Sequence, residues 1–287
     1  MTDYLIIGGT GQLGQAFARR LGSRAKAVSR PQFDLTVPGA AEALLRQYCP
    51  RIVLNCAAYN HVDQAENEPH QAFAINAFAV RELAQACAQA GALLVHFSTD
   101  YVFGLARDRR HPYVESDLSG PLSVYGASKL VGEYFVRAIT MQHLVVRTCG
   151  LYGLPGTGGK KTNFVEAILN KACRGEELNV VTDQVCSPTY VNDLVEGVLK
   201  CLDRGVNGLI HLVNEGEVSW YDFASSVLRL AGLSATIKPI RSSELGTRAP
   251  RPTYSALASE RAEAPRLRPW QAALAEYIEL RRQMGLP

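Results

Sequence analysis

The sequence contains no long hydrophobic run and almost no excess of charge of either sign. No stretch approaches the roughly 18 unbroken apolar residues of a membrane span, and residues 1–3 lead directly into apolar residues and glycines. We therefore expect neither a membrane-spanning helix nor a secretory signal. The 30 Lys and Arg residues against 27 Asp and Glu give a formal net charge of +3, which is too small an excess to indicate a nucleic-acid partner.

Cysteine and histidine lack the spacings that metal sites use. None of the seven cysteines stands in CxxC spacing with another, and the six histidines show no ligand pattern. We therefore expect no metal site and no redox pair. Reduced, mostly buried thiols are typical of a cytoplasmic protein, which is the compartment we expect. His96 and His211 lie within predicted strands and are interpreted as core histidines.

The sequence does contain enough apolar material for a large core. Hydrophobic residues make up 47% of the 287 residues and charged residues 20%, which excludes a disordered chain and leaves one large α/β unit or two small domains. Short apolar runs alternate with longer amphipathic stretches, which predicts a Rossmann-type α/β fold, a doubly wound parallel sheet with helices on both faces. The predicted strands are 4–7, 25–29, 51–56, 92–98 and 144–147, and the predicted helices are 14–21, 40–48, 69–90 and 125–138.

The pattern changes after residue 148. A ligand crevice in an open α/β sheet lies at the carboxyl ends of its strands, so we predict that the C-terminal half builds a smaller substrate-binding lobe there. The alternative is that the C-terminal half adds further elements to a single sheet and forms no separate lobe. The predicted boundaries place 1–148, 187–212 and about 258–287 in the Rossmann domain, and 149–186 and 213–257 in the lobe. We expect a mobile loop at 154–161, helices at 163–174, 192–202, 220–231 and 269–284, strands at 178–181 and 209–213, and irregular structure over 238–253.

A glycine triplet, Gly8-x-x-Gly11-x-x-Gly14, stands between the first predicted strand and the first predicted helix. A pyrophosphate needs free backbone N–H groups at a helix N-terminus and a close approach of the backbone. Glycine permits the tight turn and lacks the Cβ that would obstruct this approach. The spacing is GxxGxxG rather than GxGxxG, but its place between a strand and a helix predicts a dinucleotide site.

The second predicted strand ends in Ser29-Arg30 and lacks the acidic residue that usually binds a ribose diol. An arginine at this position can face a 2′-phosphate, so we predict that the Rossmann domain binds NADPH, with NADH as the alternative. The other interpretation of Arg30 is a solvated loop charge. Asp34 and Leu35 lie beyond Pro31 and are assigned to the adenine end of the cofactor.

Tyr125 and Lys129 are four residues apart on a predicted helix and share one face. Ser98-Thr99-Asp100 end the fourth predicted strand, at the edge of the sheet where sites form. A free tyrosine has a pKa near 10, and lowering it to about 7 requires about 4 kcal/mol. One ammonium at about 4 Å in an effective dielectric of about 20 supplies roughly that much. We therefore predict that Lys129 lowers the pKa of Tyr125 and that Thr99 holds the reacting oxygen.

These motifs resemble those of the extended short-chain dehydrogenase/reductases and, over nearly the whole chain, those of the dTDP-4-dehydrorhamnose reductase family. The glycine motif and YxxxK mark only the superfamily. Three further runs are far more specific in combination, namely Ser98-Thr99-Asp100-Tyr101-Val102-Phe103, Asp183-Gln184-x-x-Ser187-Pro188-Thr189 and Arg251-Pro252-x-x-Ser255-x-Leu257.

The resemblance implies that NADPH reduces the C4 ketone of dTDP-4-dehydro-L-rhamnose to give dTDP-L-rhamnose. It implies that Tyr125 protonates the developing alkoxide, Lys129 holds the nicotinamide ribose and Thr99 orients the ketone. Asn76 matches a family asparagine near the proton relay, and a core amide is the alternative. The expected cofactor residues are Gly8, Gly11, Gln12, Leu13, Gly14, Arg30, Asp34, Leu35, Ala57, Ala58, Tyr59, Tyr125 and Lys129. The expected substrate residues are Thr99, Tyr101, Val102, Tyr125, Asn163 and Arg251, with the loop 156–161 beside them.

Three positions depart from the family pattern. Gly150 stands in place of a tryptophan that would close over the sugar, which predicts a larger space beside the hexose. Cys186 stands where glycine is common. Gln15 and Ala16 follow Gly14 where members with a magnesium-bridged dimer have a carboxylate, so we expect a monomer or a homodimer without a bridging metal.

Other members of this superfamily are the competing hypotheses. They are a 4-ketoreductase for a different nucleotide sugar, a dehydratase or epimerase, and a non-catalytic NADP(H)-binding regulatory subunit. A dehydratase is expected to have Thr-Asp-Glu after the fourth strand, whereas this chain has Thr99-Asp100-Tyr101. The presence of Thr99, Tyr125 and Lys129 together argues for catalysis, because a regulatory subunit does not need a tyrosine whose pKa is shifted.

Overall fold

A six-stranded parallel sheet forms the centre of the computed structural model, which describes residues 2–30, 32–158 and 162–286. The strand order is β10-β5-β4-β3-β1-β2, and every neighbouring pair is parallel. The order reverses between β1 and β3, which is the topological switch point of a doubly wound sheet. The strands are β1 (Tyr4–Ile7), β2 (Ala25–Val28), β3 (Ile52–Asn55), β4 (Leu93–Thr99), β5 (His143–Thr148) and β10 (Gly208–His211).

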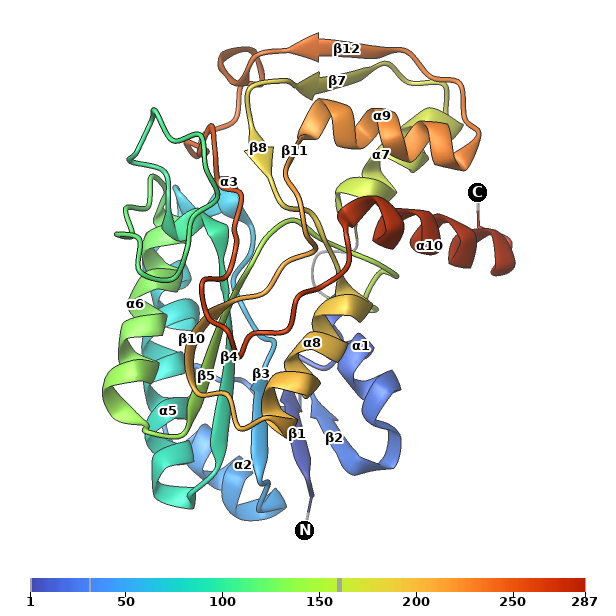
Figure 1. Ribbon diagram of the computed structural model, residues 1–287. Coiled ribbons are helices and arrows are strands. Elements are labelled where there is room, and N and C mark those ends of the chain that lie inside the picture. The colour runs from blue at the N-terminus through green and yellow to red at the C-terminus, as the bar shows by residue number, and fades with distance from the viewer. Residues whose placement is uncertain (1, 31, 159–161, 287) are drawn as a thin grey trace.

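Helices cover both faces of this sheet, which confirms the predicted Rossmann-type fold (Figure 1). One face carries α2 (Ala40–Tyr48), α5 (Ala79–Ala90) and α6 (Val124–Ile139), and the other carries α1 (Gln12–Leu21) and α8 (Val191–Asp203). The inner strands are buried along nearly their whole length because both faces are covered.

The remaining elements lie mostly beyond the carboxyl ends of the strands, at the top of Figure 1. Three two-stranded pairs join distant segments there, and α7 (Phe164–Cys173), α9 (Trp220–Ala231) and α10 (Trp270–Gln283) accompany them. The pairs are β7 (Leu178–Val181) with β12 (Ile237–Ile240), β8 (Val185–Cys186) with β11 (Val218–Ser219), and β6 (Leu151–Tyr152) with β9 (Thr189–Tyr190).

Two segments differ from their sequence-based prediction. The single helix expected over 69–90 is instead α4 (Pro69–Phe73), a π-helical turn η2 (Ala74–Phe78) and α5. The turn brings Asn76 inward, where its amide bonds to two other segments. The segment 238–253, expected to be irregular, begins with β12, in which Pro239 is tolerated because the strand is an edge. Short helices complete the chain at α3 (Val62–Ala65), η1 (Gly22–Arg24), η3 (Asp100–Val102) and η4 (Ser242–Glu244).

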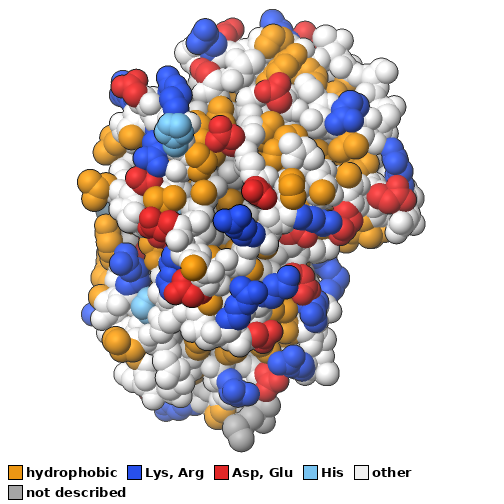
Figure 2. Space-filling view, viewed as in Figure 1, with side chains coloured by type: hydrophobic (Ala, Val, Ile, Leu, Met, Phe, Trp, Pro, Cys, Tyr) orange, Lys and Arg blue, Asp and Glu red, His pale blue; other side chains and the backbone are white. Residues whose placement is uncertain are grey.

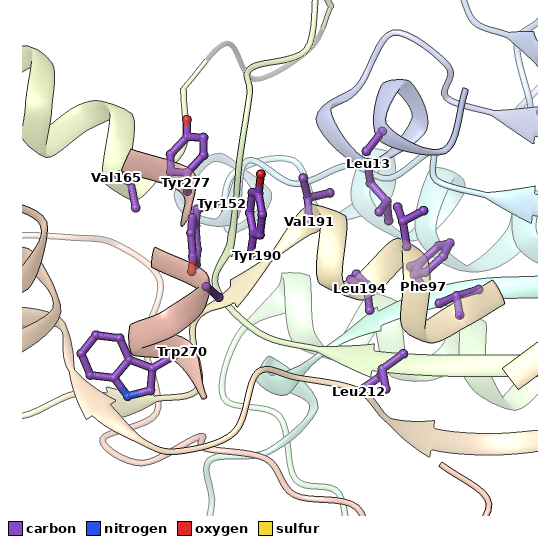
Figure 3. Packing of buried hydrophobic residues seen from close by; sticks show 14 of the residues in the cluster. Leu13, Phe97, Tyr152, Val165, Tyr190, Val191, Leu194, Leu212, Trp270 and Tyr277 are labelled. Carbon is purple, nitrogen blue, oxygen red and sulfur yellow. The ribbon is translucent and has the colours of Figure 1, made fainter. Parts of the chain in front are cut away.

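One large hydrophobic cluster joins the sheet to the elements above it. Figure 3 shows it running from Leu13 and Phe97 beside the sheet to the rings of Tyr152, Tyr190 and Tyr277. The Tyr152 ring stacks on Tyr190 at 5.6 Å between centroids and meets Tyr277 edge-on at the same distance. A second cluster fills the space between the opposite face and α2 and α5. The sheet and the upper elements therefore share one core.

Charges of both signs are interspersed over the face of the molecule in Figure 2, without an extended region of one sign. Within the part of the chain that the structure describes, no helix is both long enough and apolar enough to cross a membrane.

A buried ion pair connects α6 to β4 and β5. Arg147 on β5 donates from Nη2 to Glu133 Oε2 at 2.7 Å, and the side chains of these two residues are only 3% and 0% exposed. Ser98 on β4 donates its hydroxyl to the same carboxylate, and Arg147 also donates to Ser119 Oγ at 3.0 Å. The pair thus fixes the position of α6 over β4 and β5.

We predict that Glu133→Ala lowers the free energy of unfolding by about 3–5 kcal/mol, because it leaves the Arg147 guanidinium buried without its counter-charge. The matched control is Glu42→Ala, which removes the exposed ion pair with Arg46 on α2 and should lower stability by less than about 1 kcal/mol. Urea unfolding followed by circular dichroism measures both. Equal losses for the two variants would contradict this role of the buried pair.

Candidate active site

The glycine-rich turn lies at the switch point between β1 and β3. Gly8 has a φ of +82°, and a Cβ at this residue would lie 2.8 Å from the backbone N of Ala57. A Cβ on Gly14 would lie 2.3 Å from the carbonyl oxygen of Gly8. Gly11 caps α1 without a side-chain hydrogen bond, so the first N–H groups of the helix have no side-chain cap. The turn therefore has the close packing and the donors that a pyrophosphate site requires.

Two features of this turn bear on whether it fits a dinucleotide. The Nε2 atom of Gln12 is buried and has no hydrogen-bond partner among the described residues, which is a free donor at the expected phosphate position. The Leu13 side chain packs into the core, so this residue can offer a ligand only its backbone. Both features fit the predicted cofactor, with Gln12 contributing its amide and Leu13 its N–H.

The described part of the predicted loop lies against this turn. Gly158 donates its N–H to the carbonyl of Thr10 at 3.0 Å, and Gln15 Nε2 donates to Thr157 Oγ1 at 2.7 Å. A Cβ on Gly156 would lie 2.7 Å from the N of Gln12. Residues 156–158 thus contact the glycine-rich turn, which differs from the prediction that the loop faces the nucleotide sugar. Residues 159–161 of that prediction lie outside the described residues.

The end of β2 carries the residues assigned to the adenosine half of the cofactor. The Arg30 side chain is 61% exposed, and its Nε lies 3.6 Å from Asp34 Oδ2. Hydrogen bonds from the backbone and hydroxyl of Thr36 lower the pKa of Asp34. Leu35 is buried in the core cluster beneath β2, so its side chain packs internally, and its contact with the cofactor stays a prediction that only its backbone can fulfil.

The segment after β3 is fixed to α6 by one buried amide. Asn76 Oδ1 accepts from the N of Tyr59 at 2.9 Å, and its Nδ2 donates to the Tyr59 carbonyl and to Ser128 Oγ, both at 3.0 Å. Asn76 is therefore a structural amide that connects this segment with the helix of Tyr125. Ala57 is partly buried and Ala58 is exposed, so backbone and methyl groups are available to line the predicted nicotinamide position.

Thr99 and Tyr125 meet at the carboxyl end of β4. Thr99 is the last residue of β4, and its hydroxyl is in hydrogen-bonding contact with that of Tyr125 near the start of α6. Ser123 Oγ accepts from the N of Gly126 at 3.2 Å and Glu66 Oε1 accepts from the N of Val124 at 2.8 Å. These two bonds cap the helix and fix the position from which Tyr125 projects.

The predicted lowering of the Tyr125 pKa by Lys129 is wrong for this structure. Lys129 Nζ donates to the backbone carbonyl of Phe97 at 2.5 Å, and its charge is favoured by Glu133 rather than paired with the phenol. Burial raises the pKa of Tyr125 to about 12 and lowers that of Lys129 to about 8. Desolvation is thus the largest cause of both shifts, and the phenol keeps its proton at neutral pH.

Arg251 and Tyr101 stand next to the Thr99–Tyr125 pair. Arg251 forms two hydrogen bonds with the carboxylate of Asp63, at 3.1 and 2.7 Å, and its charge acts on Tyr101. The Tyr101 ring meets that of Tyr125 edge-on with 6.0 Å between centroids. Tyr101 and Arg251 lie beside the Tyr125 ring, and their contacts with substrate remain predictions.

Two other predicted substrate residues have internal roles. Asn163 caps α7, accepting from the N of Glu166 at 3.1 Å and donating to the Gly153 carbonyl at 2.8 Å. Its contact with substrate remains a prediction. Val102 has 0% exposure and packs with Phe103, so its side chain packs internally, and its contact with substrate stays a prediction.

Two carboxylates of the site were missed by sequence reasoning. Asp100 is buried, accepts from Ser255 Oγ at 2.6 Å and from Thr99 Oγ1 at 3.2 Å, and has its pKa raised by burial. Glu133 was missed as the partner of Arg147. Its signal was available, because an acid four residues after Lys129 falls on the same face of α6 as Tyr125 and Lys129. Within the described ranges, no cluster of three or more His, Cys, Asp or Glu side chains could hold a metal ion.

A glycine-rich turn at the switch point, together with Thr99, Tyr125 and Lys129 on β4 and α6, defines a reductase or epimerase of the short-chain dehydrogenase/reductase class. Comparison with known proteins narrows this class. The family model described as "RmlD substrate binding domain" matches residues 1–282. The chain belongs to the dTDP-4-dehydrorhamnose reductase family, and the resemblance found in the sequence is confirmed.

Three relatives illustrate this membership. The dTDP-4-dehydrorhamnose reductase of Mycobacterium tuberculosis strain H37Rv is 42% identical over 286 residues, covering 96% of this chain and 91% of that protein. The probable dTDP-4,6-dihydroxy-2-methyloxan-3-one 4-ketoreductase of Streptomyces antibioticus is 37% identical and covers 95% of this chain and 93% of that one. The crystal structure of dTDP-4-dehydrorhamnose reductase from Bacillus anthracis in complex with NADP is 34% identical, with a TM-score of 0.91, and covers 98% of this chain and 100% of that one.

We predict that Lys129→Met stabilises the protein more at pH 7 than at pH 9.5. Because burial depresses the pKa of Lys129 to about 8, the folded chain carries an unfavourable charge below that pH. Between pH 8 and pH 10.4 the unfolded chain, whose lysine pKa is near 10.4, binds more protons than the folded chain, so this destabilisation is progressively relieved as the pH rises. The advantage of the variant over the wild type should shrink by about 2 kcal/mol between the two pH values.

Urea unfolding at both pH values measures this difference, with Lys200→Met, at an exposed lysine of α8, as the matched control. An advantage of Lys129→Met that stays constant with pH would contradict the lowered pKa.

Proposed function

We propose that this chain is an NADPH-dependent reductase of the C4 ketone of a dTDP-linked deoxysugar, converting dTDP-4-dehydro-L-rhamnose into dTDP-L-rhamnose. The observation that carries this proposal is the contact between the Thr99 and Tyr125 hydroxyls at the end of β4, beside the glycine-rich turn. The activity for which the M. tuberculosis and B. anthracis relatives are named supports the substrate, and the NADP bound to the latter supports the cofactor.

The geometry assigns a proton-transfer role to Tyr125. Bound NADPH supplies the hydride. The hydroxyls of Thr99 and Tyr125 lie side by side, so both would be available to a ketone oxygen bound at the end of β4. Because the pKa of Tyr125 is raised to about 12, the phenol is protonated at neutral pH and can donate its proton to the alkoxide that forms at the ketone oxygen.

Chain residues also hold the expected cofactor. The turn of Gly8, Gly11 and Gly14 and the free amide of Gln12 would hold its pyrophosphate, and Arg30 would hold its 2′-phosphate. Lys129, which donates to the Phe97 carbonyl in this structure, would hold the nicotinamide ribose. The domain boundaries at 148, 186, 212 and 257 are part of this proposal, with the sheet side binding NADP(H) and the other side the nucleotide sugar. We also propose that the protein is cytoplasmic and is a monomer or a homodimer without a bridging metal.

A second candidate function is a 4-ketoreductase for another dTDP sugar. It is favoured by the S. antibioticus relative, which is 37% identical to this chain and is named as a 4-ketoreductase of a different dTDP-linked substrate. The non-catalytic regulatory subunit is the third, and it predicts NADPH binding without turnover of any nucleotide sugar.

The test is NADPH oxidation by the purified protein with enzymatically generated dTDP-4-dehydro-L-rhamnose. We expect turnover, and we expect Tyr125→Phe to lower kcat by about 10²–10⁴-fold because it removes the proton donor. The affinity for NADPH, measured by titration, should remain nearly unchanged in that variant. A wild-type rate for Tyr125→Phe would refute the mechanism. Turnover only with other 4-keto sugars would favour the second candidate.

Cofactor preference tests the assignment of Arg30. We predict that Arg30→Ala raises the KM for NADPH by about tenfold or more, since a charge-assisted contact with the 2′-phosphate is worth about 1.5 kcal/mol or more. The KM for NADH should not change. The control is Arg24→Ala, because Arg24 is an exposed arginine at the opposite end of β2. Equal effects of Arg30→Ala on the two cofactors would contradict the assignment.

A further inference from the structure

The space beside Gly150 is filled by an aromatic ring from another part of the chain. Gly150 has a φ of +50°, and a Cβ at this position would lie 3.0 Å from Cη2 of Trp220 and 3.3 Å from the Cα of Pro188. Trp220 is the first residue of α9, seventy positions further along the sequence. The prediction of a larger space beside the hexose is therefore wrong, because the indole of Trp220 occupies that space.

The indole is held rigidly and remains partly exposed. Its ring lies 4.4 Å from the ring of Phe164 and 6.1 Å from that of Phe223, and its backbone N donates to the Gln184 carbonyl at 3.2 Å. Trp220 is only partly buried, although most large aromatic residues of this core are buried completely. A fixed aromatic ring with an exposed part is suited to contact a ligand, because little side-chain entropy is lost on binding.

Cys149 lies between the Trp220 indole and the Thr99–Tyr125 pair. The Cys149 thiol is in hydrogen-bonding contact with Asp100 and with Cys186, and it lies close enough to Tyr125 to act on its charge. Gly150 follows Cys149 directly in the chain. The Trp220 ring, which covers Gly150, therefore lies next to a residue that neighbours the Tyr125 phenol. Trp220 also packs against the cluster that contains Cys149 and Cys186. The departures at Gly150 and Cys186 therefore lie under the same indole.

We propose that Trp220 forms the aromatic wall of the sugar subsite, with its ring against the apolar face of the 6-deoxyhexose, and that Gly150 is required because a side chain there would displace this ring. This inference rests on the proposed function, since it assigns a sugar-contacting residue to the same site. A deoxysugar has an apolar C–H face and a methyl group, and aromatic side chains commonly line sites for such surfaces.

The sequence offers a direct spectroscopic test, because Trp220 and Trp270 are its two tryptophans. Trp270 is 7% exposed and lies in the main core, 5.5 Å from the ring of Phe223. In Trp270→Phe, Trp220 is the remaining indole. We expect dTDP-L-rhamnose to change its fluorescence in a saturable manner and dTDP alone to leave it nearly unchanged. Equal responses to the two ligands, or no response while dTDP-L-rhamnose binds by calorimetry, would overturn the proposal.

The same measurement can be made in the wild type if Trp270→Phe does not fold. The ligand-induced change should then be present in the wild type and absent from Trp220→Leu. In the NADPH assay, Trp220→Leu should raise the KM for the sugar about tenfold with little change in kcat, and Trp220→Phe should restore most of this loss. An unchanged KM for Trp220→Leu would overturn the proposal, even where the proposed function holds.

Gly150→Ala provides a second line of test with a matched control. Its Cβ would push the indole, so we expect a raised KM for the sugar and a smaller fluorescence response. Gly175→Ala introduces similar strain, because Gly175 has a φ of +69° but no atom within 4 Å of its would-be Cβ. Gly175→Ala should leave the KM unchanged. Equal KM values for the two variants would count against the role of Trp220.

Failure of the proposed function gives a different result. Absence of turnover together with a fluorescence response specific to dTDP-L-rhamnose would keep Trp220 in the sugar subsite and redirect the chemistry. Absence of both turnover and response would overturn the function and this inference together.

Discussion

The ion pair between Glu133 and Arg147 is the interaction on which the geometry of the site depends. Both side chains are withdrawn from water, so each requires the other, and the pair spans α6 and β5. Ser98 joins it from β4, and Ser98 immediately precedes Thr99. In the register of the sheet, Ser98 lies opposite Arg147 and Thr99 opposite Thr148. A single charge pair thus aligns the strand that carries Thr99 with the helix that carries Tyr125 and Lys129.

The sequence was sufficient for those parts of the fold that arise from local patterns. The parallel sheet, its helices and the glycine-rich turn were predicted because each is encoded by hydrophobic periodicity or by backbone needs within a short segment. The π-helical turn around Asn76 was not predictable in this way. It depends on hydrogen bonds to Tyr59 and Ser128, which are distant in the sequence. The edge strand β12 was missed because Pro239 interrupts its pattern and its partner, β7, is remote.

In the candidate site, too, the features encoded by local patterns were predicted and those that depend on distant segments were missed. YxxxK spacing and the strand end predicted that Tyr125 and Thr99 would meet, and their hydroxyls do so. The direction of the Tyr125 pKa was mispredicted, because a Coulomb estimate for one ammonium ignores desolvation and the carbonyl of Phe97 that engages Lys129. Similarly, a glycine at position 150 predicts an opening only if nothing else reaches it. No pattern in the sequence connects Gly150 with Trp220, and their contact is a property of the tertiary fold.

The shared core restricts how the molecule can move. Opening a hinge between the sheet and the elements above it would break the cluster that runs from Leu13 on α1 and Phe97 on β4 to the rings of Tyr152, Tyr190 and Tyr277. Packed cores of this kind resist gradual deformation. Residues 156–158, in contrast, are joined to the glycine-rich turn by a few hydrogen bonds at its surface. The contact of this segment with the turn can therefore be broken without disturbing the packing of the shared core.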